Sequence, residues 1–170
     1  FYQATGNGPD LSDNALLETL EQWLLPYLTG MRRLEHLKSL DMLTILKARL
    51  DWSTLQSLDR QIPVHVIVPS GSSIGIDYTD PMAPVLPVKL EMFGATETPS
   101  IIDGAIALSI HLLSPAGRPL QITRDLQAFW RNTYPQVKAE MRGRYPKHPW
   151  PDDPLAAAPT RHTKNRMNRK

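Results

Sequence analysis

Apolar residues recur at helical spacing through the first sixty residues of the chain. Leu16, Leu20 and Trp23 fall on one face when the chain is wound at about 3.6 residues per turn. Ser12 or Asp13 stands just before this pattern, and either side chain can accept a hydrogen bond from a free N–H group of the first turn. The pattern therefore predicts a helix that begins at this point.

Two shorter helices are predicted to follow. One spans 41–50 with Asp41 as its N-cap, and the next begins after Asp51 or Ser53. The leucines expected to be buried are Leu43, Leu46, Leu50, Leu55 and Leu58.

The pattern changes to alternation after Pro63. Val64, Val66 and Val68 alternate with His65 and Ile67, which predicts a strand. Residues 69–72 are turn formers, and 73–78 alternate again, so these two strands are expected to pair as a hairpin.

The middle of the chain mixes clear and ambiguous segments. Residues 87–93 fit either a strand or a short helix that ends at Gly94, and we predict the helix. Residues 105–113 are almost uniformly apolar and predict a strand, followed by a tight turn over 115–118 and a strand over 119–122.

Two helices are predicted near the C-terminus. The first spans 124–132 with Thr123 as N-cap and buries Leu126, Phe129 and Trp130. The second follows Thr133, which has capping-box spacing with Gln136, and runs to about 142 with Val137 and Met141 inward. After residue 145 no period remains, and frequent prolines predict an extended arm.

These elements predict an α+β fold. It has an N-terminal helical part, a small antiparallel sheet, two C-terminal helices and an extended, proline-rich basic arm. The expected organisation is a disordered or linker segment at 1–10, a helical subdomain at 11–61, an α+β domain at 62–148 and an extended basic tail at 149–170.

Charge is distributed unevenly along the chain. Residues 136–170 hold nine Lys or Arg against three Asp or Glu, whereas the first 135 residues have a net charge of −4. A basic C-terminal part after an acidic body points either to an anionic partner such as nucleic acid or to a solvated tail.

The sequence lacks the residues and motifs that several kinds of functional site require. The chain has no cysteine, which excludes disulfides and thiolate nucleophiles and fits a reducing cytoplasm. It has no Gly-x-x-x-x-Gly-Lys-Ser/Thr motif, no close histidine pair for zinc and no 18-residue apolar run to span a membrane. Asp152 and Asp153 could clamp a metal, but a local cap or a salt bridge is the preferred interpretation. The sequence therefore predicts no catalytic residue and no metal site.

Basic and aromatic residues alternate near the C-terminus, as they do in sites that hold single-stranded nucleic acid by charge and stacking. The candidates for nucleic-acid contact are Arg118, Arg124, Arg131, Tyr134, Lys138, Arg142, Arg144, Tyr145, Lys147, Trp150, Arg161, Lys164 and Arg166. The alternative is that Tyr145 and Trp150 fix the arm onto the domain and that Trp130 is core. We expect the basic members to form one contiguous surface.

Lys138 and Arg142 stand four residues apart and share a helix face, while Glu140 lies on another. Two like charges side by side destabilise a helix slightly, so we expect an anion between them, either a phosphate or a carboxylate of another domain.

Five segments carry a resemblance to a known family: Trp23-Leu-Leu-Pro-Tyr-Leu28, Leu37-Lys-Ser-Leu-Asp41, Val68-Pro-Ser-Gly-Ser72, Glu91-Met-Phe-Gly94 and Leu113-Ser-Pro115. With them the chain resembles the C-terminal region of HrpB-type bacterial ATP-dependent helicases, relatives of the DEAH-box RNA helicases, from about Leu11 to Lys164.

The resemblance implies a non-catalytic accessory region of a longer protein. The chain does not begin with Met, which also suggests a fragment of a longer chain. ATP and magnesium are expected in the parent's motor domains, with no cofactor in this part. The expected partners are those motor domains and single-stranded RNA, and no interaction with a membrane is expected. The alternative is a protein–protein interaction module that never touches RNA. The sequence does not indicate an oligomeric state.

Overall fold

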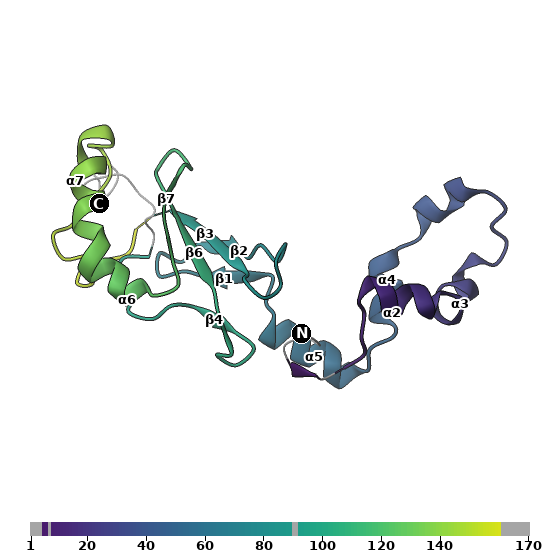
Figure 1. Ribbon diagram of the computed structural model, residues 1–170. Coiled ribbons are helices and arrows are strands. Elements are labelled where there is room, and N and C mark those ends of the chain that lie inside the picture. The colour runs from purple at the N-terminus through teal and green to yellow at the C-terminus, as the bar shows by residue number, and fades with distance from the viewer. Residues whose placement is uncertain (1–4, 7, 90–91, 161–170) are drawn as a thin grey trace. The chain divides into compact units, whose positions relative to one another are not determined.

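A computed structural model gives the arrangement of the chain (Figure 1). It describes residues 5–6, 8–89 and 92–160. The chain divides into two compact units, with unit 1 formed by Phe1–Ile62 and unit 2 by Pro63–Lys170.

Unit 1 is built from short helices. In chain order they are α2 (Asp13–Glu18), α3 (Leu20–Trp23), the 3₁₀ helices η1 (Leu25–Leu28) and η2 (Leu34–Ser39), α4 (Met42–Lys47) and α5 (Trp52–Gln61). The predicted first helix is thus divided at Thr19, and η2 was not predicted. The predicted caps are confirmed, because Ser12, Asp41 and Asp51 each accept a hydrogen bond from an N–H group of the first turn.

Few large apolar side chains of unit 1 are buried. Among its described residues, the buried ones are Trp23 and Ile45. The prediction that Leu43 is buried is wrong, since 62% of it is exposed. Leu43 and Ile45 are two positions apart, about 200° around the helix, so they point to opposite sides of α4. The other four leucines predicted to be buried are half-buried.

Seven short strands lie among the described residues of unit 2. They are β1 (His65–Ile67), β2 (Ser73–Gly75), β3 (Val85–Lys89), β4 (Ser100–Ile101), β5 (Ile106–Ala107), β6 (Ser109–Leu113) and β7 (Pro119–Thr123). β1 and β2 form the predicted antiparallel hairpin, and β4 pairs with β5 in the same way. The central sheet has the order β3-β6-β7, in which β7 is antiparallel to β6 but β3 is parallel to it. The α+β class is confirmed. The central sheet differs from the predicted antiparallel sheet in its parallel pair, β3 and β6.

The predicted helix over 87–93 is wrong. Val85–Lys89 is strand β3, in which Leu86 and Val88 are buried while Pro87 and Lys89 are exposed. The strand gains its hydrogen-bonding partner from β6, more than twenty residues further along, so local spacing could not reveal it. Pro87 lacks an N–H group and is tolerated because β3 lies at an edge of this sheet.

The apolar run 105–113 is divided into two strands. The backbone N–H of Leu108 donates to the carbonyl of Pro99, and that of Ser109 donates to the carbonyl of Pro84. The chain therefore changes partner at Leu108, leaving β4 and joining β3.

An aromatic cluster forms much of the core of unit 2. Phe93, Phe129, Trp130 and Tyr134 lie with ring centroids 4.9–6.4 Å apart, mostly edge to face. The indole N–H of Trp130 donates to the carbonyl of Ala95 at 2.9 Å, so its polar atom is satisfied. The predicted burial of Phe129 and Trp130 is confirmed.

The C-terminal helices form one continuous helical stretch. α6 (Leu126–Ala128) is followed by the π-helix η3 (Phe129–Thr133) and then by α7 (Tyr134–Arg144). Asp125, not Thr123, caps α6, because its carboxylate accepts from the N–H of Ala128. The predicted capping box at Thr133 is not formed, since its backbone is already helical and its side chain makes no cap bond.

The arm that follows α7 is bound to unit 2 along residues 145–154. Trp150 is buried and donates its indole N–H to the carbonyl of Tyr145. The hydroxyl of Tyr134 donates to the carbonyl of Pro151, and the N–H of Gly94 donates to that of Pro154. Trp150 therefore packs the arm against unit 2, which is the alternative to nucleic-acid contact that the sequence left open for this residue.

Candidate nucleic-acid interface

The structure separates the candidate residues into groups with different surroundings. Tyr134 and Trp150 are buried in unit 2, so their rings face its core and not solvent. Burial and the nearby charge of Asp152 raise the pKa of the Tyr134 phenol above its ordinary value, so the hydroxyl stays protonated and donates to Pro151.

One side of α7 is neutralised by the arm. Lys138 forms an ion pair with Asp152 and is only 15% exposed. The hydrogen bond and charge of Lys138, together with the charge of Arg142, lower the pKa of the Asp152 carboxyl. The anion beside Lys138 is therefore a carboxylate of this chain, which corrects the expectation of a phosphate or another domain. Asp153 accepts from the N–H groups of Leu155 and Ala156, so both carboxylates act locally, as preferred.

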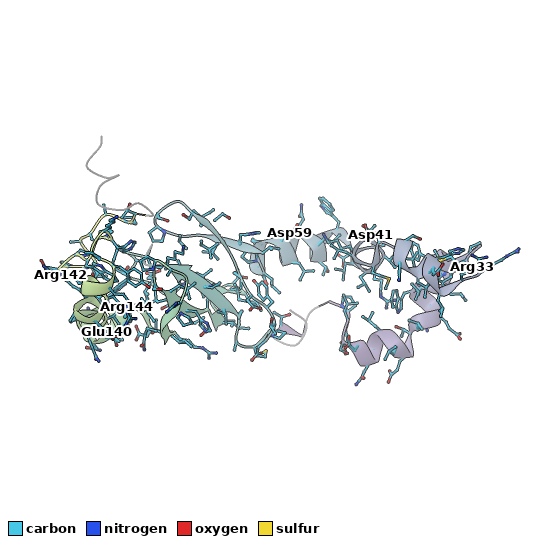
Figure 2. All side chains as sticks on the ribbon, turned by 90° about the horizontal axis from the view of Figure 1, so that it is seen from above. Arg33, Asp41, Asp59, Glu140, Arg142 and Arg144 are labelled. Carbon is cyan, nitrogen blue, oxygen red and sulfur yellow. The ribbon has the colours of Figure 1, made fainter. Side chains whose placement is uncertain are left out.

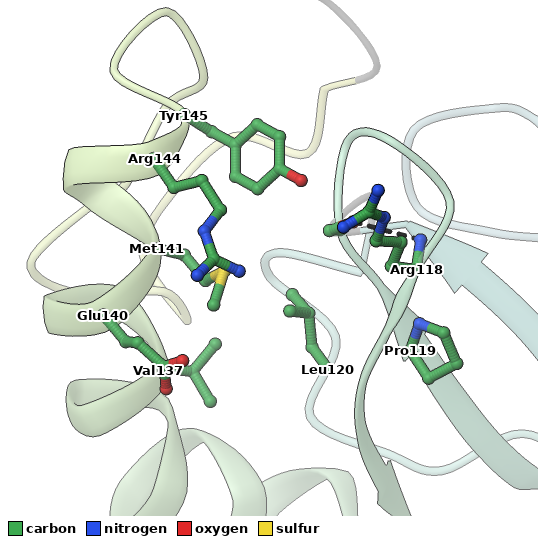
Figure 3. Close-up of a pocket in the computed structure, with 9 residues that line it drawn as sticks. Arg118, Pro119, Leu120, Val137, Glu140, Met141, Arg144 and Tyr145 are labelled. Atoms are coloured by element: carbon green, nitrogen blue, oxygen red, sulfur yellow. Dashed lines mark hydrogen bonds between the residues drawn. The ribbon is translucent and has the colours of Figure 1, made fainter.

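The opposite side of α7 borders a cavity of about 200 Å³ (Figure 3). Arg142 and Arg144, both labelled in Figure 2, are about 200° apart around the axis of α7, so they leave different sides of the helix. Arg144 and Glu140 line the cavity on the helix side, and Val137 and Met141 are its buried floor. The expected contiguous basic surface is therefore divided between two sides of one helix.

A hydrogen-bonded turn supplies the other wall of this cavity. Ser114 donates its N–H to the carbonyl of Arg118, and its hydroxyl accepts from the N–H of Arg118 at 3.1 Å. Gly117 has a φ of 78°, a conformation that favours glycine. This is the predicted turn of 115–118, and it holds Arg118 opposite Arg144, with Leu120 of β7 beside it.

A second cavity, of about 290 Å³, adjoins the first. Its lining residues are Pro115, Arg144, Tyr145, Pro146, Lys147 and His148. Arg144 and Tyr145 line both cavities, so the two adjoin at these side chains. We call the combined site, with Arg118, Arg144, Tyr145 and Lys147, the basic cleft.

The remaining candidates lie elsewhere. Arg124 and Arg131 are exposed and line neither cavity. Arg161, Lys164 and Arg166 lie outside the described residues.

Sequence reasoning missed the part of Glu140 in this site. Glu140 and Arg144 are four residues apart, which is the same spacing that put Lys138 beside Arg142. That signal was available, but the facing wall of the cavity is more than twenty residues earlier and comes only from the fold.

The part of the chain that the structure describes lacks both a metal-binding cluster and a membrane-spanning helix. It holds no group of three or more His, Cys, Asp or Glu side chains that could bind a metal ion. No helix in that part has the length and apolar character needed to cross a membrane.

Comparison with known proteins supports the resemblance seen in the sequence. A family model described as "ATP-dependent helicase C-terminal" (HrpB_C) matches residues 23–154. The ATP-dependent RNA helicase HrpB of Escherichia coli K12 is 52% identical over 157 residues, which cover 92% of this chain and 19% of that protein.

Solved structures agree with this. A crystal structure of the E. coli DExH-box NTPase HrpB matches with a TM-score of 0.84 and 51% identity, over 92% of this chain and 20% of that one. A second, of the E. coli DEAH/RHA helicase HrpB, matches with a TM-score of 0.69 and 45% identity, over 88% and 19%. The chain spans about a fifth of the length of these relatives, and it belongs to the HrpB-type ATP-dependent helicase C-terminal family.

Proposed function

We propose that this chain is a non-catalytic accessory region of an ATP-dependent RNA helicase. Unit 2 contacts single-stranded RNA through the basic cleft and extends the path of the nucleic acid. Unit 1 docks on the motor domains of the same polypeptide, which bind ATP and magnesium. The lack of cysteine fits a reducing compartment, and a cytoplasmic location is part of the proposal.

The observation that carries the RNA contact is that three cations line two adjoining cavities. Arg118 comes from a turn, Arg144 from the end of α7 and Lys147 from the arm. Within the described residues none of the three forms an ion pair, whereas Lys138 does. Half-buried Tyr145 lies between the two cavities. Positive charge along a backbone path with an aromatic face beside it is the usual arrangement for binding single strands.

The docking proposal rests on the apolar surface of unit 1. Leu34 is 84% exposed and Trp52 is 73% exposed, and seven further large apolar side chains are exposed among the residues of unit 1 that the structure describes. Where such side chains gather on one part of a molecule, they are typical of a protein interface. The partner we assign is the motor region, since four fifths of the E. coli relative's length lies outside the match.

Binding of fluorescent single-stranded RNA to the 170-residue chain tests the RNA contact. Three phosphate contacts predict that affinity falls roughly 20-fold between about 50 mM and about 200 mM salt, because each contact on a single strand contributes about 0.7 to the logarithmic slope. Replacing Arg118 and Arg144 together by serine should weaken binding and reduce that slope by about 1.4.

A matched control removes the same charge elsewhere. Arg32→Ser with Arg33→Ser also deletes two exposed cations, but from unit 1. If this control weakens binding as much as the cleft variant does, general charge and not the cleft binds RNA. If the chain binds no RNA at low salt, the alternative of a protein-interaction module is favoured, for which the apolar surface of unit 1 already provides a specific observation.

A further inference from the structure

The cavity between α7 and β7 is lined by a carboxylate, Glu140, which a site that binds only phosphate does not need. Glu140 lies on the same side of α7 as Arg144 and lines the cavity with it (Figure 3). A carboxylate repels phosphate, so a groove that only follows an RNA backbone gains nothing from it. Within the described residues Glu140 forms no ion pair, although Arg144 stands four positions away. Its acceptor oxygens therefore remain available to a ligand.

The floor and size of the cavity restrict that ligand further. Val137 and Met141 are buried and Leu120 is half-buried, so the floor is apolar. The volume, about 200 Å³, is below the roughly 300–1,000 Å³ of sites for drug-sized molecules. The volume and the apolar floor suit a group about the size of one planar ring system.

The polar groups at the rim specify the rest of the ligand. An ionised carboxylate only accepts hydrogen bonds, so the edge facing Glu140 must carry N–H donors. Arg118 and Arg144 call for an anion at the other end, because guanidinium groups bind phosphate through paired N–H donors. A nucleotide has all three features: a flat base, an edge with donors and a phosphate.

We propose that this cavity receives one base of the bound RNA strand and prefers guanine. This inference rests on the proposed RNA contact. Glu140 accepts from the adjacent N1–H and N2–H groups of guanine, while Arg118 and Arg144 hold a flanking phosphate. Adenine and cytosine each offer one amino group beside a ring-nitrogen acceptor, and uracil offers one N–H between two carbonyl oxygens that repel the carboxylate. Single-stranded RNA is commonly read in this way, base by base, on the Watson–Crick edge.

The test measures binding of the 170-residue chain to decamers of uridine that carry one central substitution. A central guanosine should bind at least about fivefold more tightly than uridine, because a good bidentate pair discriminates by that factor or more. Inosine at the same place lacks the amino group, and its advantage should fall to less than half that of guanosine. This comparison changes the ligand only, so it does not depend on the folding of a variant.

Glu140→Gln is the matching change in the protein. It should reduce the preference for guanosine to less than about twofold and raise the affinity for all-uridine RNA, because a negative charge leaves the cleft. Equal binding of all decamers, or an unchanged preference in Glu140→Gln, overturns the guanine site while the RNA contact stands. Failure of every decamer to bind at low salt overturns both. Displacement of guanosine RNA by an acidic peptide but not by GMP would assign the cavity to a protein partner and also overturn it.

Discussion

Unit 1 and unit 2 differ most in where their large apolar side chains lie. Unit 2 buries eighteen of them, from Val68 to Trp150, and exposes four among its described residues. Within the described part of unit 1, Trp23 and Ile45 are buried and nine large apolar side chains are exposed. Its longest helix has ten residues, and helices of that length depend on packing for their stability. Unit 2 thus carries its own core, whereas unit 1 buries few large apolar side chains, which is why we propose that it packs on a partner.

The largest expected effect comes from removing a core aromatic of unit 2. Trp130→Ala should lower the free energy of unfolding of unit 2 by about 3–5 kcal/mol, because it leaves a cavity in the aromatic cluster. Trp52→Ala, a tryptophan of unit 1 that is 73% exposed, should change stability by less than about 0.5 kcal/mol. Urea denaturation and hydrogen exchange at β6 amides measure both. Equal losses would remove the contrast between the units.

The next effect concerns docking. Leu34→Ser with Trp52→Ser should weaken binding of this chain to separately supplied motor domains of E. coli HrpB at least about tenfold, or about 1.4 kcal/mol. Val64→Ser with Ile67→Ser changes two side chains of unit 2 that are each 69% exposed, and it should have little effect. Calorimetric titration provides the affinities. Similar losses in both variants, or no binding of the unaltered chain, would contradict docking through unit 1.

The next prediction concerns the pH dependence of the Asp51 cap, which should stabilise α5 less as the pH falls. Hydrogen bonds from the Ser53 hydroxyl, the Thr54 N–H and the Thr54 hydroxyl lower the pKa of Asp51 from 3.8 to about 2. Because the folded pKa is the lower one, the cap's contribution is complete well above pH 3.8 and is lost as the pH falls toward 2. Hydrogen exchange of α5 amides should therefore accelerate between pH 5 and pH 2.

Asparagine at position 51 can still cap but does not titrate. Asp51→Asn should therefore make α5 less sensitive to acid than the unaltered chain, once the intrinsic pH dependence of exchange is corrected. Asp59→Asn, which removes a carboxylate from the same helix away from its cap, should leave that sensitivity in place. A similar response of the two variants would argue against the cap.

The smallest effect is expected at the ion pair between α7 and the arm. Asp152→Asn removes the charge that faces Lys138 and should increase the rate of proteolysis within 145–154 roughly two- to fivefold, since an ion pair whose carboxylate is fully exposed contributes little. Asp153→Asn keeps an acceptor for the N–H groups of Leu155 and Ala156 and is the control. An unchanged rate in Asp152→Asn would show that Trp150 holds the arm without help.

Local signals in the sequence were sufficient for elements that depend on neighbouring residues. The caps at Ser12, Asp41 and Asp51, the β1–β2 hairpin and the turn before Arg118 are each formed within a few residues. The inward positions of Val137 and Met141 followed from helical spacing alone.

Elements that depend on distant partners could not be found in this way. Strand β3 owes its state to β6, and the change of partner at Leu108 depends on Pro84 and Pro99. The candidate site shows the same limit. Charge and spacing selected Lys138 and Arg144 alike, but only the fold shows that Asp152 neutralises Lys138 while Arg144 faces Arg118 across a cavity.

The binding of the arm sets the smallest piece of unit 2 that can be transplanted into another protein. A cut after Arg144 would remove Trp150 from the core and leave the buried Tyr134 hydroxyl without the carbonyl of Pro151. A buried polar group without a partner costs about 1–3 kcal/mol. A transplanted cassette must therefore keep the chain through Pro154, whose carbonyl binds Gly94, and its junction with a host protein belongs after that residue.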